Sequence, residues 1–208
     1  MKTIQLFTYI FLFALLASCS SDDDNTPPLQ EIESQTITNL HAPQQGGQGE
    51  PISGAFTKFD FETGTITTSE TDWDIAFRGT AIIVNGGTSL GTNDEPNRSG
   101  EAAAYIATGT MASVTEVNTG LFVQDSETGY ALPSGSGNSW YIYNSDTFLI
   151  TPIAGRILVF QTRDGKYAKV EILSYYKDAP ENPDPFINEG RYFTFSYVYQ
   201  PIEGVTTF

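Results

Sequence analysis

The chain has 208 residues, which suits one large β domain or two small ones, and its 39% hydrophobic and 13% aromatic residues can form a packed core. Its formal net charge of −15, with no basic cluster, argues against nucleic acid as a partner and against charge-driven binding to an anionic membrane. One cysteine and one histidine exclude an internal disulfide and a Cys/His zinc cluster.

Residues 1–18 have the pattern of a secretory signal peptide. Lys2 supplies the positive start, and residues 4–16 form a mostly apolar run of 13 residues. A membrane-spanning helix needs about 20 residues, so this run fits a signal peptide better. The sequence LASC, which ends at Cys19, resembles the bacterial lipobox. We therefore expect cleavage before Cys19 and a lipid anchor on it, with enough acyl chains for stable attachment.

Residues 19–33 are polar, acidic and Pro-containing, and they have no apolar periodicity. This composition predicts a flexible tether. The acidic run at residues 22–24 resembles a signal that some Gram-negative lineages use to export lipoproteins to the cell surface, although a solvated spacer has the same composition. We expect an outer-membrane lipoprotein, anchored at Cys19 and exposed on the cell surface.

Residues 34–208 have the pattern of short strands separated by turns. Residues 157–162 and 167–176 are rich in β formers and flank Asp164-Gly165, a favoured hairpin turn. Residues 191–201 alternate in the manner of a final strand. No helical stripe extends over more than about two turns. We therefore predict a single antiparallel all-β domain over residues 34–208.

The stretch TDWDIAFRG, residues 71–79, fits either a pair of catalytic carboxylates or a core strand. In a strand, Asp72 and Asp74 would lie on one face about 7 Å apart, and Arg78 on the same face would help to balance their charge. The opposite face would carry the apolar side chains Trp73, Ile75 and Phe77. We interpret the stretch as a strand that enters a sheet.

Three loops are candidates for function. Residues 85–103 and 125–139 are rich in Gly, Asn and Ser; long loops on β scaffolds often carry function, but neutral insertions have the same composition. The sequence GTSLG at residues 87–91 matches a nucleophile elbow, but no helix pattern follows and His41 precedes it, so a catalytic triad has little support. The acidic residues 178–190 lack the spacing of an EF-hand and contain three prolines, which favours a stiff solvated loop over a calcium site.

The order of four segments resembles the HmuY family of haem-binding surface lipoproteins. They are TDWDIAFRG, NGGTS-LGT, GKYAKVEILSYYKD and FTFSYVYQP, and the resemblance covers roughly residues 56–201. It implies an all-β fold of HmuY type and a binding protein, not an enzyme. Such a protein takes up haem as cargo and passes it to a TonB-dependent outer-membrane receptor.

The iron ligands are where this sequence departs from the family. The best-known members hold haem iron with two histidines, yet residues 110–155 contain no histidine, and His41 would contribute only by reaching the site from the N-terminal segment. Some relatives use methionines, and tyrosine also holds haem iron. The candidate ligands are therefore Tyr130, Tyr141, Tyr143 and Met111, although each tyrosine could instead be a packing residue. No metal other than haem iron is expected.

Two functions remain open from the sequence. The chain is a haem-binding lipoprotein with unusual or one-sided iron ligation, in which apolar contact with the porphyrin supplies much of the affinity. Alternatively, the HmuY fold is kept for another cargo, namely another tetrapyrrole, a glycan or a protein partner. A structural adhesin-like module has no positive feature in the sequence.

Overall fold

The computed structural model describes residues 32–208. The predicted signal peptide, the lipidation site at Cys19 and nearly all of the predicted tether lie outside these residues. The first strand, β1 (Glu33–His41), begins at the last residue of that tether. Within residues 32–208, no helix is long and apolar enough to cross a membrane.

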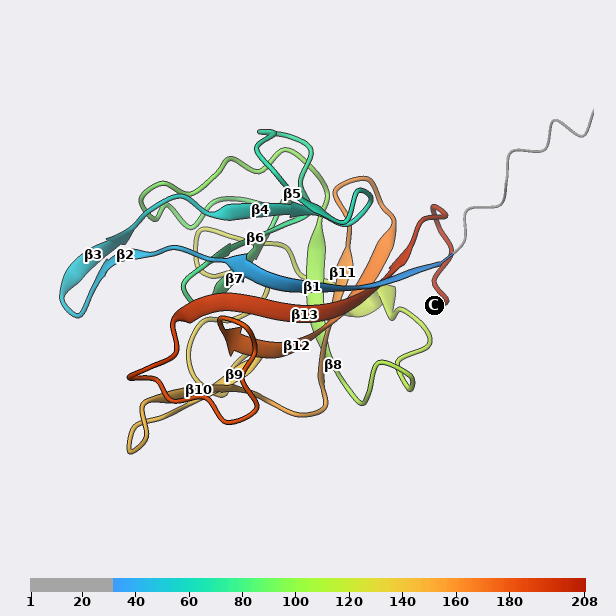
Figure 1. Ribbon diagram of the computed structural model, residues 1–208. Helices are drawn as coiled ribbons and strands as arrows, with labels where there is room; N and C mark the ends of the chain where they lie inside the picture. The colour runs from blue at the N-terminus through green and yellow to red at the C-terminus, as the bar shows by residue number, and fades with distance from the viewer. Residues whose placement is uncertain (1–31) are drawn as a thin grey trace, which may run out of the picture.

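Two antiparallel sheets pack against each other across a shared core (Figure 1). The larger has the order β1-β13-β12-β11-β8, and its further strands are β8 (Ala103–Thr108), β11 (Arg156–Gln161), β12 (Tyr167–Tyr176) and β13 (Gly190–Gln200). The smaller has the order β5-β4-β6-β7, with the strands β4 (Thr57–Asp60), β5 (Thr65–Thr67), β6 (Ile75–Arg78) and β7 (Ala81–Val84). The predicted antiparallel all-β fold is confirmed.

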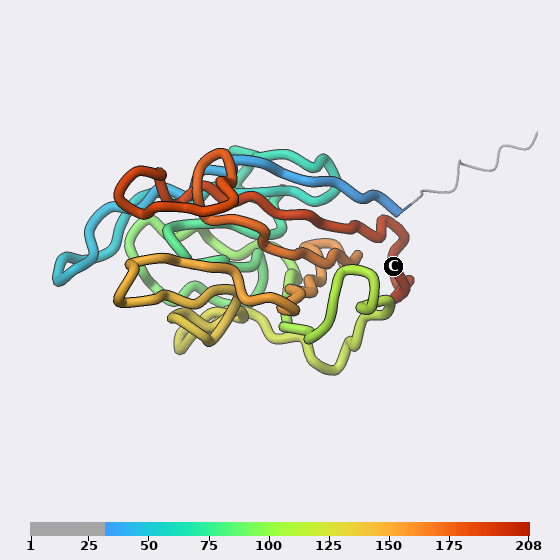
Figure 2. The backbone as a smooth tube through the Cα atoms, turned by 60° about the horizontal axis from the view of Figure 1, so that its bottom comes forward, coloured from blue at the N-terminus to red at the C-terminus, as the bar shows by residue number. Residues whose placement is uncertain are grey.

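Two hairpins extend beyond the sheets at one end of the molecule. They are formed by β2 (Gln45–Gly47) with β3 (Glu50–Ser53), and by β9 (Tyr141–Asn144) with β10 (Leu149–Pro152). Figures 1 and 2 show both hairpins, and the loop 178–190 between β12 and β13, at the end opposite to the C-terminus and to the start of β1. We call the two hairpins, this loop and the adjoining β6–β7 turn the loop end.

Aromatic residues of the last strand form much of the core between the sheets. Phe193, Phe195, Tyr197 and Tyr199 are all buried, as the alternation of residues 191–201 indicates. Phe195 lies 5.5 Å from Phe59 and 5.7 Å from Phe77 between ring centroids, within the range of favourable aromatic pairs. The larger sheet is thereby joined to β4 and β6 of the smaller one.

The predicted hairpin of residues 157–176 is also confirmed. β11 and β12 pair in antiparallel fashion with Leu158 opposite Val170. Gly165 in the turn has a φ of +85°, a conformation that glycine adopts without steric cost. Local turn chemistry and strand propensity agree here, so the sequence alone specifies the hairpin.

The prediction that Asp72 and Asp74 lie on one face of a strand is wrong. Only Ile75–Arg78 of the stretch forms a strand, because the preceding residues turn. Asp72 is exposed and accepts a hydrogen bond of 3.0 Å from the hydroxyl of Ser69. Asp74 is buried and accepts the backbone N–H groups of Phe61 and Arg163 at 2.9 Å each.

The prediction that Arg78 balances the charge of these carboxylates is wrong as well. Arg163 Nη1 lies 3.3 Å from Asp74 Oδ1 and 2.9 Å from Asp60 Oδ1, so Arg163 balances the buried charge. Arg78 instead bonds to loop atoms at the loop end. Trp73 is buried, as expected, but it packs with Phe56 on the outer side of the smaller sheet, away from Ile75 and Phe77.

Candidate functional site

The loop end contains two pockets, one on each side of residues 41–44. His41 lines the first pocket and Gln44 lines the second. Their volumes are about 460 Å³ and about 270 Å³. We call them the His41 pocket and the Tyr130 pocket. Ligand sites in proteins commonly have volumes of about 300–1,000 Å³, so only the His41 pocket falls in that range.

The Tyr130 pocket has an apolar wall made by Ile52, Ala81 and Leu90. Its polar side is a chain of hydrogen bonds that meet at the hydroxyl of Thr92. Arg78 Nη2 donates to Thr92 Oγ1 at 2.7 Å, and Thr92 Oγ1 donates to Glu95 Oε2 at 3.0 Å. The hydroxyl of Tyr130 lies 3.3 Å from the same oxygen. Because the proton of Thr92 goes to the carboxylate, Tyr130 must act as the donor.

A buried ion network underlies this pocket. Arg98 Nη2 lies 2.6 Å from Glu95 Oε1 and 2.7 Å from Asp125 Oδ2, and all three side chains are almost fully buried. Asp125 also accepts the backbone N–H groups of Val84 and Ala131. The network is complete, and it fixes the loops 85–102 and 125–139 against the smaller sheet.

Burial raises the pKa of Tyr130 above its ordinary value, while the nearby guanidinium of Arg78 acts in the opposite direction. The phenol is therefore protonated at neutral pH. To hold a metal ion as phenolate, Tyr130 would have to lose this proton and its hydrogen bond to Thr92.

Aromatic rings make up half of the lining of the His41 pocket. They come from β1, β12 and β13 and from the turn before β10: His41, Tyr175, Tyr176, Tyr192 and Phe148. The imidazole of His41 stacks on Tyr192, with ring centroids 4.5 Å apart and planes inclined by 15°. This contact follows from the pairing of β1 with β13, in which His41 lies opposite Tyr192. Tyr176 Oη accepts the backbone N–H of Ile150, which ties the β9–β10 hairpin to the larger sheet.

Charged and exposed apolar side chains surround the mouth of the His41 pocket. Glu189 and Arg191 line it, and Lys177 lies 3.5 Å from Glu189. Phe148 is 52% exposed, and its ring meets that of Phe186, which is 80% exposed, at a centroid distance of 5.7 Å. The pocket thus has an aromatic interior and a rim that carries both charges and large apolar groups.

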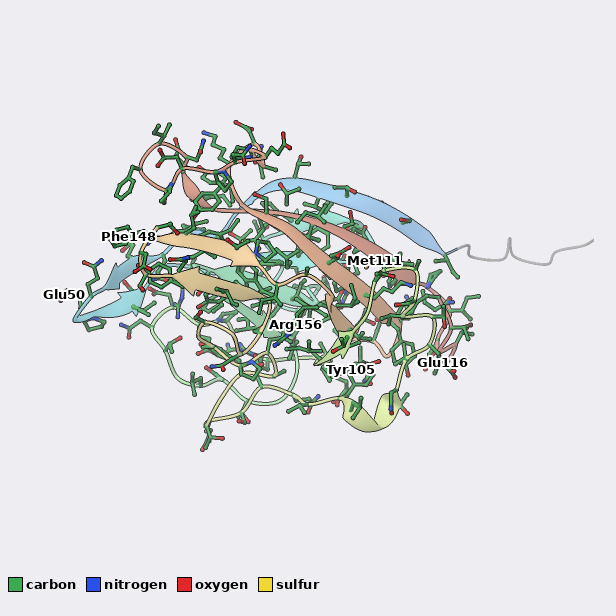
Figure 3. All side chains as sticks on the ribbon, turned by 90° about the horizontal axis from the view of Figure 1, so that it is seen from below. Glu50, Tyr105, Met111, Glu116, Phe148 and Arg156 are labelled. Carbon is green, nitrogen blue, oxygen red and sulfur yellow. The ribbon has the colours of Figure 1, made fainter. Side chains whose placement is uncertain are left out.

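The four ligands predicted from the sequence do not converge. Tyr130 lines a pocket, whereas Tyr141 is buried against Trp140 and accepts a hydrogen bond from the hydroxyl of Thr80. Tyr143 is 43% exposed on β9 and lines neither pocket. Met111 packs on the outer side of the larger sheet, and Figure 3 shows it far from Phe148, near Glu116.

His41 is the residue whose position differs most from the sequence-based expectation. The sequence suggests a position near the tether. In the structure His41 is the last residue of β1, and it lines the larger pocket without any movement of the N-terminal segment. The only sequence signal is the alternation of residues 35–40, which predicts a strand but not its length or its partner. The contact with Tyr192 joins residues 151 positions apart, which a local pattern cannot reveal.

A bare metal ion has no evident site in the part of the chain that the structure describes. Within residues 32–208, no group of three or more His, Cys, Asp or Glu side chains is placed to hold one. The acidic side chains of the loop 178–190 therefore form no such group either.

Comparison with known proteins places the fold. The model of the HmuY protein family matches residues 54–197. An apo HmuY analogue of Tannerella forsythia has a TM-score of 0.52 and 14% sequence identity, over 85% of this chain and 100% of its own. No curated protein matches the sequence.

Two Bacteroides structures are also similar. A protein of Bacteroides vulgatus, described as HmuY-like and haem-binding, has a TM-score of 0.49 and 16% identity, over 86% of this chain and 96% of its own. A protein of Bacteroides fragilis, described as a lipoprotein, has a TM-score of 0.48 and 14% identity, over 85% and 93% of the two chains. At 14% identity, the similarity to the Tannerella forsythia structure concerns the fold alone.

Proposed function

The chain belongs to the HmuY family, and on that premise we propose that it is an outer-membrane lipoprotein that captures haem at its loop end. It then passes the haem to a TonB-dependent receptor, and it acts as a binding protein rather than as an enzyme. The observation that carries this proposal is the presence of both pockets at one end of a family member, each lined in part by one of the two projecting hairpins.

The residues at the loop end fit a porphyrin in their chemistry. A porphyrin is a planar apolar ring with two carboxylates, and aromatic and aliphatic side chains line both pockets. Arg191 and Lys177 supply cations beside the larger pocket for the carboxylates. Haem iron accepts ligands from His, Tyr, Cys and Met side chains. Of the four ligands proposed from the sequence, Tyr130 is the one that lines a pocket.

The orientation of the domain supports capture of haem from the surroundings of the cell. β1 starts at the end opposite to the loop end, so a lipid anchor at Cys19 would leave the loop end directed away from the bilayer. A flexible tether of the length of residues 19–33 spans on the order of 20 Å. The pockets are open at the surface, which leaves part of a bound porphyrin accessible for transfer.

A haemin titration of the purified lipoprotein in detergent tests the proposal. We expect a saturable one-to-one change of absorbance in the Soret region that a non-binding lipoprotein treated in the same way does not give. Co-purification of the protein with a TonB-dependent receptor would test the delivery step. A flat titration would contradict haem capture.

A second candidate function is carriage of a non-haem cargo, such as another tetrapyrrole, a glycan or a protein. It is favoured by the absence of histidine from residues 110–155 and by the protonated state of Tyr130. Iron-free protoporphyrin separates the two candidates. Equal affinity for protoporphyrin and haemin would favour a carrier that does not hold the iron.

A further inference from the structure

The imidazole of His41 is free to bind a ligand. The hydrogen bonds that the described residues make to His41 involve its backbone only. No described residue hydrogen-bonds to its ring nitrogens, and His41 lines a 460 Å³ pocket. Neutral imidazole is the commonest metal ligand in proteins. The hydroxyl of Tyr130, by contrast, is already bonded to Thr92 in the smaller pocket.

The backbone around the same pocket is strained at two lining residues. Phe148 has a φ of 60° and Arg191 a φ of 70°. Residues other than glycine rarely adopt this region, and those that do concentrate at ligand clamps and active sites. Both residues direct side chains to the pocket lining, so the strain coincides with the groups that would hold a ligand.

The pocket also combines the other groups that a porphyrin needs. Phe148 and Phe186 form an aromatic rim that is exposed to solvent, and large exposed apolar groups beside a pocket are typical of binding sites. Lys177 Nζ lies 5.3 Å above the ring of Tyr192. Arg191 lines the pocket and donates one hydrogen bond of 2.7 Å to the carbonyl oxygen of Gln44. These two cations stand out in a chain with 25 acidic and 10 basic residues, although Glu189 partly offsets them.

We propose that the His41 pocket, rather than the Tyr130 pocket, receives the haem, and that the imidazole of His41 is an axial ligand of its iron. The inference rests on the proposed function. It names an iron ligand outside residues 110–155, the interval in which the family resemblance predicts the iron ligands. Phe148 and Tyr176 would contact the porphyrin, and Arg191 and Lys177 would face its carboxylates.

Haemin titration of His41→Ala, in parallel with Tyr130→Phe and the unaltered lipoprotein, tests this assignment. We expect His41→Ala to lose at least about tenfold in affinity, since loss of one axial ligand removes a bond worth more than about 1.4 kcal/mol. Low-temperature electron paramagnetic resonance should show a changed iron environment in His41→Ala. Free imidazole should restore the original spectrum, because it can occupy the space of the deleted ring.

Tyr130→Phe tests the rival pocket: a loss of haemin affinity in this variant, with His41→Ala unchanged, would place the haem beside Tyr130 and overturn the inference. Circular dichroism melting checks that both variants are folded, which is expected because His41 is exposed. Equal affinity and spectra for His41→Ala and the unaltered protein would overturn the inference while haem carriage stands. A flat titration of the unaltered protein would instead remove the proposed function itself.

Discussion

The Tyr130 pocket lies over a buried and complete ion network, whereas the His41 pocket is lined by aromatic rings, a free imidazole and strained backbone. In the first, each buried charge already has partners within the protein, so its side chains mainly hold loops in place. In the second, several groups have bonding capacity or strain that the protein itself does not use. On the assignment proposed above, the first region stabilises the loop end and the second binds the cargo.

The strongest test of this division is Asp125→Ala, which leaves Arg98 buried without one of its two carboxylates. We expect a loss of about 3–5 kcal/mol in the free energy of unfolding, measured by urea denaturation, because removal of one partner leaves a buried charge uncompensated. Glu127→Ala, an exposed acid two residues away, should change stability by less than about 0.5 kcal/mol. Similar stabilities for the two variants would contradict the structural role of the network.

The pH dependence of stability should come from Asp74, which lines neither pocket. Burial raises the pKa of Asp74 to about 6, from an ordinary value of 3.8. Between these pH values the folded protein keeps a proton that the unfolded chain has released, so this group's contribution to stability falls as pH rises from about 4 to about 6. The difference corresponds to about 3 kcal/mol.

Urea denaturation of the unaltered protein and of Asp74→Asn between pH 4 and pH 7 measures that contribution. The unaltered protein should show a steeper loss of stability over this range than Asp74→Asn. Asp72→Asn is the control, because Asp72 is exposed, and it should keep the pH dependence of the unaltered protein. A parallel pH dependence in the unaltered protein and Asp74→Asn would exclude Asp74 as the source.

The rim of the His41 pocket should matter for binding but little for folding. Phe148→Ala removes an aromatic contact with the cargo, and such contacts contribute about 0.5–1.5 kcal/mol, so haemin affinity should fall about 2- to 12-fold. Ile66→Ala removes a similarly exposed apolar side chain from β5 and should leave the titration unchanged. An unaltered haemin affinity in Phe148→Ala would place the cargo elsewhere.

The smallest effect is expected at Met111. This residue lies on the outer side of the larger sheet, away from the loop end, and Met→Leu conserves volume. Met111→Leu should therefore leave haemin affinity within about twofold and stability within about 1.5 kcal/mol. A clear loss of Soret absorbance in this variant would show that the predicted methionine ligand acts after all, at the opposite end of the molecule.

The parts of the fold that the sequence predicts correctly depend on local patterns. The Asp164-Gly165 turn and the alternation of residues 191–201 each specify an element within a few residues. The partner of Asp74 is not local, since Arg163 lies 89 residues further along the chain. A strand pattern assigns Asp74 to a face, but it cannot reveal which loop brings a guanidinium to it.

The candidate site is harder to predict than the fold for the same reason. Tyr130 stands out in a long loop, yet its hydrogen bond to Thr92 becomes evident only when two loops are packed together. His41 stands out as the sole histidine of the chain, but no local pattern places it in a pocket beside Tyr192. Its environment is assembled from the ends of β1, β12 and β13 and from β10, which are separated by up to about 150 residues.

Anomalous X-ray scattering at the iron edge, from crystals of the protein grown with haemin, would test the central claim most directly. The account predicts one iron position per chain, in the His41 pocket and within bonding distance of the His41 imidazole. Iron beside Tyr130, or at any site away from His41, would contradict it.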